Sequence, residues 1–151
     1  MDHTAYNKRF NNAIKNLFQG KSWEIRAEGA QELGNLKDGR AVNSLTKALH
    51  RENDEVVINR IIEALGKIGN PKATMPLIDF LRQEVEKPES EQNKKLLFNI
   101  IDSLMAIGDN RALTHLGILL DSCPEDIQKR TEEAFSCINP DWKQNLKQKN
   151  K

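Results

Sequence analysis

The sequence predicts an all-α protein: a right-handed α–α superhelix (α-solenoid) of about four stacked helical hairpins, preceded by a lone N-terminal helix. Three observations support this fold class. A motif recurs along the chain, the apolar residues inside each copy follow helical spacing, and eight Gly and five Pro in 151 residues are too few for a sandwich of short strands. A composition of 38% hydrophobic and 30% charged residues also excludes a disordered chain.

One apolar anchor defines each copy of the repeat. The anchors are Leu33, Leu65, Leu104 and Phe135, which are 32, 39 and 31 residues apart. The longer spacing reflects extra residues within 82–95, where the sequence predicts a prolonged helix followed by a turn. A single hairpin of this kind cannot bury its apolar stripe alone, so neighbouring copies must stack.

The first copy shows the pattern of two amphipathic helices. Its apolar positions follow a period of about 3.6 residues on both helices. They are Ile25, Ala30, Leu33 and Leu36 on the first helix and Val42, Leu45, Ala48 and Leu49 on the second. The break between the two helices carries Asp38, and the later copies carry Asn70 and Asp109 there. These side chains can accept hydrogen bonds from the free N–H groups that open the second helix.

The predicted organisation is one domain over residues 1–151. It comprises an N-terminal capping helix at 1–20, repeats at 22–50, 54–87 and 90–121, a partial C-terminal repeat at 122–142 and a basic tail at 143–151. In the capping helix, Ile14 and Phe18 correspond to Leu45 and Leu49 of the first repeat. We therefore expect a lone helix that is equivalent to the second helix of a repeat.

The repeat resembles a known family. The stretch Ile25-Arg26 to Leu49 is similar to the HEAT-like repeat of phycobilisome lyases, whose pattern is V-R-x-x-A-A-x-A-L-G-x-L-G-D-P-R-A-V-x-x-L-x-x-A-L. Residues 57–81 and 96–120 match it nearly as well, although the early Arg is present only as Arg26. The resemblance implies an α-solenoid that serves mainly as a binding scaffold.

Charge and hydropathy exclude several classes of function. The chain has 23 Lys and Arg against 22 Asp and Glu, a net charge of +1, so no overall field attracts nucleic acid or an acidic membrane. No apolar run approaches the ~20 residues of a membrane span, and the N-terminus lacks a secretory signal. Two cysteines, Cys123 and Cys137, form no disulfide framework, and we expect a cytoplasmic protein.

No catalytic, cofactor-binding or metal-binding constellation is predicted. His3, His50 and His115 are isolated from one another, and no Gly-rich phosphate loop is present. Asp38 and Asp109, each followed two residues later by an Arg, are open to two interpretations. They are either helix caps within a ladder of polar contacts or members of an active site, and we expect the caps.

The predicted binding surface is the concave face, which the second helices line in such solenoids. Its residues lie opposite the core positions of those helices: Asn43, Lys47, His50, Met75, Ile78, Asp79, Arg82, Thr114 and Ile118. Met75, Ile78 and Ile118 would form an apolar centre rimmed by charge, as in many protein-binding surfaces. Alternatively, neighbouring helices or a second copy cover these three side chains, or the assumed helical register is off by one residue.

The sequence therefore predicts a non-enzymatic scaffold or adaptor that binds a protein or peptide segment on its concave face. One alternative, implied by the family resemblance alone, is a subunit or chaperone-like partner of a bilin lyase-type enzyme. Another is a weak nucleic-acid-binding protein. That function requires a stripe of Lys and Arg, but Asp79 and Asp121 interrupt Lys15, Lys47 and Arg82.

Overall fold

The protein is all-α, as predicted, and its helical hairpins pack as in an α-solenoid. The computed structural model describes residues 3–119 and 124–141, which contain helices and no strand. The α-helices are α1 (His3–Gln19), α2 (Trp23–Leu36), α3 (Val42–Arg51), α4 (Glu55–Ile68), α5 (Thr74–Val85), α6 (Lys94–Ile107), α7 (Arg111–Leu119) and α8 (Glu125–Ile138). Short 3₁₀ helices occur at η1 (Gly39–Ala41), η2 (Pro71–Ala73) and η3 (Glu89–Glu91). None of the described helices combines the length and apolarity that a membrane span requires.

The chain divides into two compact units, and each is considered by itself. Unit 1 comprises residues 1–73 and unit 2 residues 74–151, so the division falls inside the second predicted repeat, between η2 and α5. The predicted basic tail at 143–151 lies outside the described residues.

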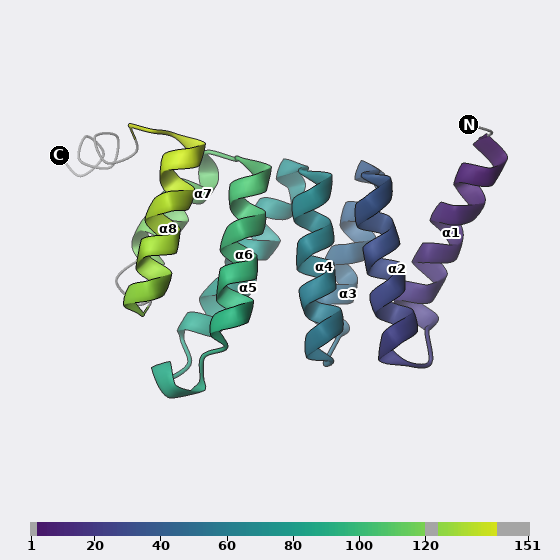
Figure 1. The fold of residues 1–151 in the computed structure, drawn as a ribbon, viewed down its shortest axis with the longest axis horizontal. Helices are drawn as coiled ribbons and strands as arrows, with labels where there is room; N and C mark the ends of the chain where they lie inside the picture. The colour runs from purple at the N-terminus through teal and green to yellow at the C-terminus, as the bar shows by residue number, and fades with distance from the viewer. Residues whose placement is uncertain (1–2, 120–123, 142–151) are drawn as a thin grey trace. The chain divides into compact units, whose positions relative to one another are not determined.

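In unit 1, two first helices lie side by side and the second helices pack against them. α2 packs along α4, α1 packs on the other side of α2, and α3 packs on α4 (Figure 1). The anchors Leu33 and Leu65 are fully buried, as are Leu45 of α3 and Ile61 of α4. These apolar positions therefore form the core that the repeat pattern predicts.

The ends of the helices in unit 1 follow the capping rules that the sequence suggests. Ser22 Oγ accepts a hydrogen bond from the N–H of Ile25 at the start of α2. Asp38 accepts from the N–H of Arg40 and opens η1, and Asn70 accepts from the N–H of Lys72 in η2. The predicted caps between first and second helices are confirmed here.

A close approach between α1 and α2 depends on Gly29. A Cβ atom at this position would lie 2.8 Å from the backbone oxygen of Ala13 and 2.7 Å from the backbone nitrogen of Leu17. Any larger residue would force the two helices apart. Figure 1 shows α1 inclined against α2. The missing side chain of Gly29 permits this contact.

Unit 2 repeats the arrangement with a longer connection. α5 packs against α6 and α7, and α6 packs against α8. The anchors Leu104 and Phe135 are fully buried, so they occupy core positions like those of Leu33 and Leu65. α5 ends at Val85, and η3 lies in the connection to α6, where the sequence predicts a prolonged helix and a turn.

Candidate functional site

In unit 1, the second helix α3 presents the predicted polar face to solvent. Asn43, Lys47 and His50 are exposed, whereas Val42 and Leu45 on the opposite side are buried. The sequence pattern therefore places these three side chains correctly on the helix. Whether a partner binds them stays a prediction.

In unit 2, the predicted site residues differ in exposure. Asp79 and Arg82 are exposed on α5 and form an ion pair with 3.4 Å between Oδ1 and Nη1. Met75 is half-buried, and Thr114 is exposed on α7. The side chain of Ile118 lies outside the described part of the chain.

The prediction that Ile78 lies on the exposed face is wrong. Its side chain is fully buried. The buried residues of α5 include Thr74, Leu77, Ile78 and Leu81, which follow the spacing of one apolar stripe. The buried stripe of α5 is thus wider than that of α3. The residue of α3 that corresponds to Ile78 is Thr46, which is only half-buried. Core packing, not partner binding, explains this apolar residue.

The turn between α2 and α3 carries a tightly paired carboxylate. Arg40 donates to both oxygens of Asp38, with Nη2 2.7 Å from Oδ2 and Nε 3.1 Å from Oδ1. The hydroxyl of Tyr6 on α1 donates to Oδ2 at 3.0 Å. The Arg40 guanidinium, aided by the Arg40 N–H and the Tyr6 hydroxyl, lowers the pKa of Asp38 to about 2.

The same motif recurs in unit 2. Asp109 accepts a hydrogen bond from the N–H of Arg111 at 3.0 Å, and its Oδ2 pairs with Arg111 Nη2 at 2.7 Å. The Arg111 side chain is the main cause that lowers the pKa of Asp109 to about 2. A carboxylate held in its ionised form by a neighbouring guanidinium is a weak general base. Both motifs therefore act as helix caps, and this geometry does not support the active-site interpretation.

Arg26 joins the start of α2 to the connection between α3 and α4. Its Nε lies 2.9 Å from Oε2 of Glu52, and its Nη1 donates to the carbonyl oxygen of Gly20 at 3.1 Å. Glu52 Oε1 in turn accepts from the N–H groups of Asn53 and Asp54. The single early Arg of the repeat pattern is thus a structural residue.

Two arginines of unit 1 cover aromatic rings of α1. The guanidinium carbon of Arg40 lies 4.6 Å from the centroid of Phe10, and that of Arg51 lies 5.9 Å from the centroid of Phe18. Both rings are half-buried. Sequence reasoning missed these contacts, although the four-residue spacing of Tyr6, Phe10, Ile14 and Phe18 signals one continuous face of α1.

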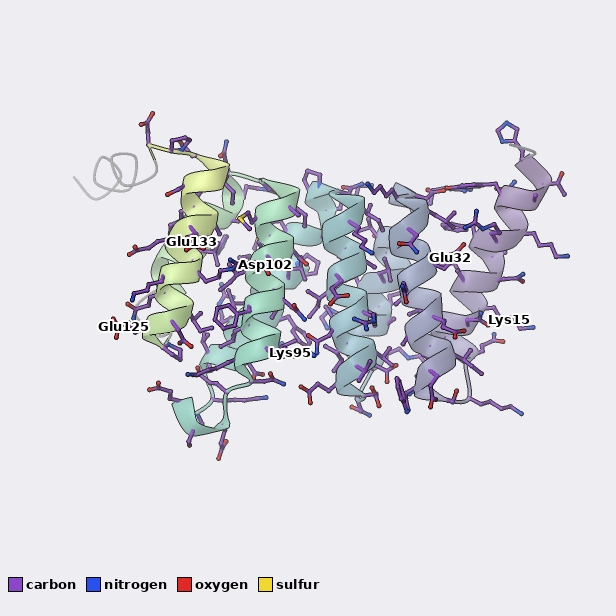
Figure 2. The ribbon with its side chains drawn as sticks, viewed as in Figure 1. Lys15, Glu32, Lys95, Asp102, Glu125 and Glu133 are labelled. Carbon is purple, nitrogen blue, oxygen red and sulfur yellow. The ribbon has the colours of Figure 1, made fainter. Side chains whose placement is uncertain are left out.

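A polar groove between α1 and α2 was also missed. Its floor consists of Ala13 and Gly29, and Arg9 of α1 pairs with Glu32 of α2 across it. Figure 2 shows Glu32 on the side of α2 that faces α1. The available signal was Gly29, which stands where the repeat pattern has Ala and so permits the close approach that shapes this groove.

Among the residues that the structure describes, no group of three or more His, Cys, Asp and Glu side chains could hold a metal ion. The described Asp and Glu side chains instead take part in caps or ion pairs or are exposed on helix surfaces.

Comparison with known proteins gives two findings. The family described as HEAT repeats matches residues 11–90. The "Bilin biosynthesis protein PecE" of Mastigocladus laminosus is 35% identical over 66 residues, which are 44% of this chain and 24% of that protein. The chain thus matches only about a quarter of the length of this relative.

Proposed function

The chain belongs to the HEAT-repeat family, and we propose that it is a non-catalytic scaffold that binds a protein or peptide segment through the exposed faces of its second helices. The observation that carries the proposal is the face of α3, where Asn43, Lys47 and His50 are exposed side by side. Residues at spacings of three and four share one side of a helix, so a partner can contact all three at once.

The pairing of ionisable groups supports binding over catalysis. The two carboxylates with strongly lowered pKa values, Asp38 and Asp109, are both held by neighbouring arginines. Side chains engaged in this way stabilise turns and do not present a free base or nucleophile to a substrate. The exposed polar faces of α3 and α5 remain available for contacts with a partner.

Selection of peptides from a display library on the immobilised 151-residue chain tests the proposal. For unit 1, we expect N43A/K47A/H50A to weaken binding of the selected peptides by at least ~10-fold, a loss of about 1.4 kcal/mol. For unit 2, M75A/D79A/R82A tests the face of α5 separately. All substituted side chains are exposed or half-buried, so helical circular dichroism should stay at the level of the parent.

A matched control substitutes exposed residues of the first helix α2, in the variant E24A/E28A/Q31A. It should bind the selected peptides as the parent does. Loss of binding in this control, with retention in the second-helix variants, would place the site on the first helices and refute the proposal.

A second candidate function follows from the relative. Its printed name concerns bilin biosynthesis, and the match of 66 residues supports a role for this chain as a partner of a bilin lyase-type enzyme. Absorbance titration with an open-chain tetrapyrrole tests whether the chain itself binds a bilin. A shifted bilin spectrum on addition of the protein would support this role, and an unchanged spectrum would leave no basis for bilin binding by the chain itself.

A further inference from the structure

The charges of unit 1 are divided between its first and second helices. α1, η1 and α3 carry the cations Lys8, Arg9, Lys15, Arg40, Lys47 and Arg51 and contain no Asp or Glu. In contrast, α2 carries three Glu and one Arg, and α4 carries two Glu, one Arg and one Lys. The second helices therefore form the basic side of this unit.

Most of these cations lack a compensating carboxylate. Arg9 pairs with Glu32 and Arg40 with Asp38. Lys8, Lys15 and Lys47 are exposed and form no ion pair with any residue in the described ranges, and Arg51 contacts the ring of Phe18. We call Lys8, Lys15, Lys47 and Arg51 the basic face.

The basic face comprises residues of two helices that are in contact, α1 and α3. Contacts of Arg40 with Phe10 and of Arg51 with Phe18 hold η1 and α3 against α1. Lys8 and Lys15 are seven residues apart, which places both on the side of α1 opposite buried Ala13 and Leu17. Figure 2 shows Lys15 pointing away from α2. Uncompensated cations on adjacent helices favour a negatively charged ligand.

We propose that the basic face of unit 1 binds an acidic peptide segment, an inference that rests on the proposed function and specifies the partner. The cations supply charge complementarity to carboxylates. The half-buried side chains of Phe10 and Phe18 supply apolar contact to Leu or Phe side chains of the same segment.

An acidic peptide fits this surface better than nucleic acid does. Arg40 and Arg51 cover the faces of the two phenyl rings, so the rings are unavailable for stacking with bases. Four cations also release few counterions from a duplex. Unit 2, residues 74–151, contains 11 Lys and Arg against 13 Asp and Glu, so it adds no net positive charge that would attract a long polyanion. A short acidic segment can bind unit 1 alone.

Fluorescence anisotropy with a labelled dodecapeptide of alternating Glu and Leu tests the proposal on the 151-residue chain. We expect this peptide to bind more tightly than its counterpart with Gln in place of Glu, and binding to weaken as salt is added. The variant K15E/K47E should weaken binding by at least ~10-fold because it reverses two charges of the basic face.

The matched control is K21E/K67E, which changes the net charge of unit 1 by the same amount. Lys21 precedes α2 and Lys67 lies on α4, and both are exposed and outside the basic face. This control should bind the acidic peptide within ~2-fold of the parent, since long-range charge alone is largely screened. Unchanged helical circular dichroism in both variants establishes that they are folded.

Three results would overturn the inference. The Gln peptide could bind as tightly as the Glu peptide, or the two variants could lose affinity equally. A short DNA duplex could also bind more tightly than the acidic peptide and respond to K15E/K47E, which would identify nucleic acid as the ligand. If library peptides bind through Asn43, Lys47 and His50 but are not acidic, the proposed function stands and only the acidic partner is wrong.

Discussion

Different side-chain contacts in the two units hold the connection between one repeat and the next. In unit 1, Arg26 at the start of α2 reaches Glu52 after α3, and Glu52 accepts two backbone N–H groups. In unit 2, fully buried Leu97 stands at the position of Arg26. The connection from α5 to α6 is held instead by Glu84, which pairs with Lys87 at 2.8 Å and accepts from the N–H of Asn93 at 2.7 Å. The apolar anchors are thus the fixed part of the repeat, and its connections vary.

The units also differ in what their second helices present to solvent. α3 has an exposed face with Lys47 and His50 and contains no carboxylate, whereas α5 pairs Arg82 with Asp79 on its exposed side. α5 also has a wider apolar stripe that includes Ile78. The same helix of the repeat therefore supplies a basic surface in one unit and a mixed, more deeply packed surface in the other.

The largest expected effect tests whether the anchors are equivalent in the two units. Leu65 and Leu104 are both fully buried, so truncation to Ala removes apolar contacts and leaves a cavity. We expect L65A and L104A each to lower the free energy of unfolding by ~2–5 kcal/mol, measured by urea denaturation. A loss below ~1 kcal/mol in either variant would show that the two positions are not equivalent.

Breaking the connection of unit 1 should have the next largest effect. The side chain of Glu52 is only 10% exposed, so R26A leaves a largely buried carboxylate without its main partner. We expect R26A to lower the unfolding free energy by about 1–3 kcal/mol. In unit 2, K87A removes a partner that is 51% exposed, and its effect should stay below ~1 kcal/mol.

A double-mutant cycle with R26A and E52A isolates the pair in unit 1. If the two single substitutions add without coupling, or if K87A proves as damaging as R26A, the distinction between the two connections is wrong.

The capped turns should respond to acid in both units. Asp38 and Asp109 have pKa values of about 2 in the folded protein, below the ~3.9 of an unfolded chain. These two carboxylates therefore contribute to the unfolding free energy above pH ~4, and this contribution is lost as the pH falls towards 2. Because Arg40 and Arg111 are well exposed, we expect a contribution of only about 1 kcal/mol from each turn.

Urea denaturation between pH 2 and pH 5 measures this contribution. D38N and D109N should each flatten the pH dependence of stability. Y6F removes the hydroxyl that donates to Asp38. It should reduce only the pH-dependent stabilisation that comes from the Asp38 turn of unit 1. A pH dependence that both Asn variants leave unchanged would refute the role of the two turns.

Much of the fold could be predicted because its determinants are local and repeated. The anchors Leu33, Leu65, Leu104 and Phe135 recur with helical spacing, and all four are buried. Caps such as Asp38 act within two residues of themselves, so the sequence reveals them directly. The arrangement of each helix pair follows from these local rules together with the need to bury the apolar stripe.

The candidate site could be predicted only in part, because exposure depends on neighbouring helices. Asn43, Lys47 and His50 are exposed on α3, and their place in a binding surface stays a prediction. Ile78 is buried instead, since the width of a buried stripe is set by packing that the pattern of one helix cannot show. The contacts of Arg40 and Arg51 with aromatic rings join residues about one repeat apart in the sequence, and the pattern within a single copy does not show them.

Substitutions in the connection between α5 and α6 should have the smallest effect on the unfolding free energy. Glu89, Ser90 and Glu91 of η3 are exposed, and the two glutamates form no ion pair among the described residues. The hydrogen bonds that shape η3 use backbone atoms, from the N–H of Glu91 to the oxygen of Pro88 and from the N–H of Gln92 to the oxygen of Glu89. E89A/E91A keeps these bonds, so its unfolding free energy in urea should lie within ~0.5 kcal/mol of the parent.

The contrasting variant is E84A, five residues before Glu89. It removes a carboxylate that is 7% exposed and holds both Lys87 and the N–H of Asn93, so it should destabilise unit 2 clearly more than E89A/E91A. Equal effects of the two variants would mean that Glu84 does not close this connection. The Arg26–Glu52 ion pair of unit 1 would then have no charged counterpart in unit 2. Buried Leu97 alone would take the place of that pair.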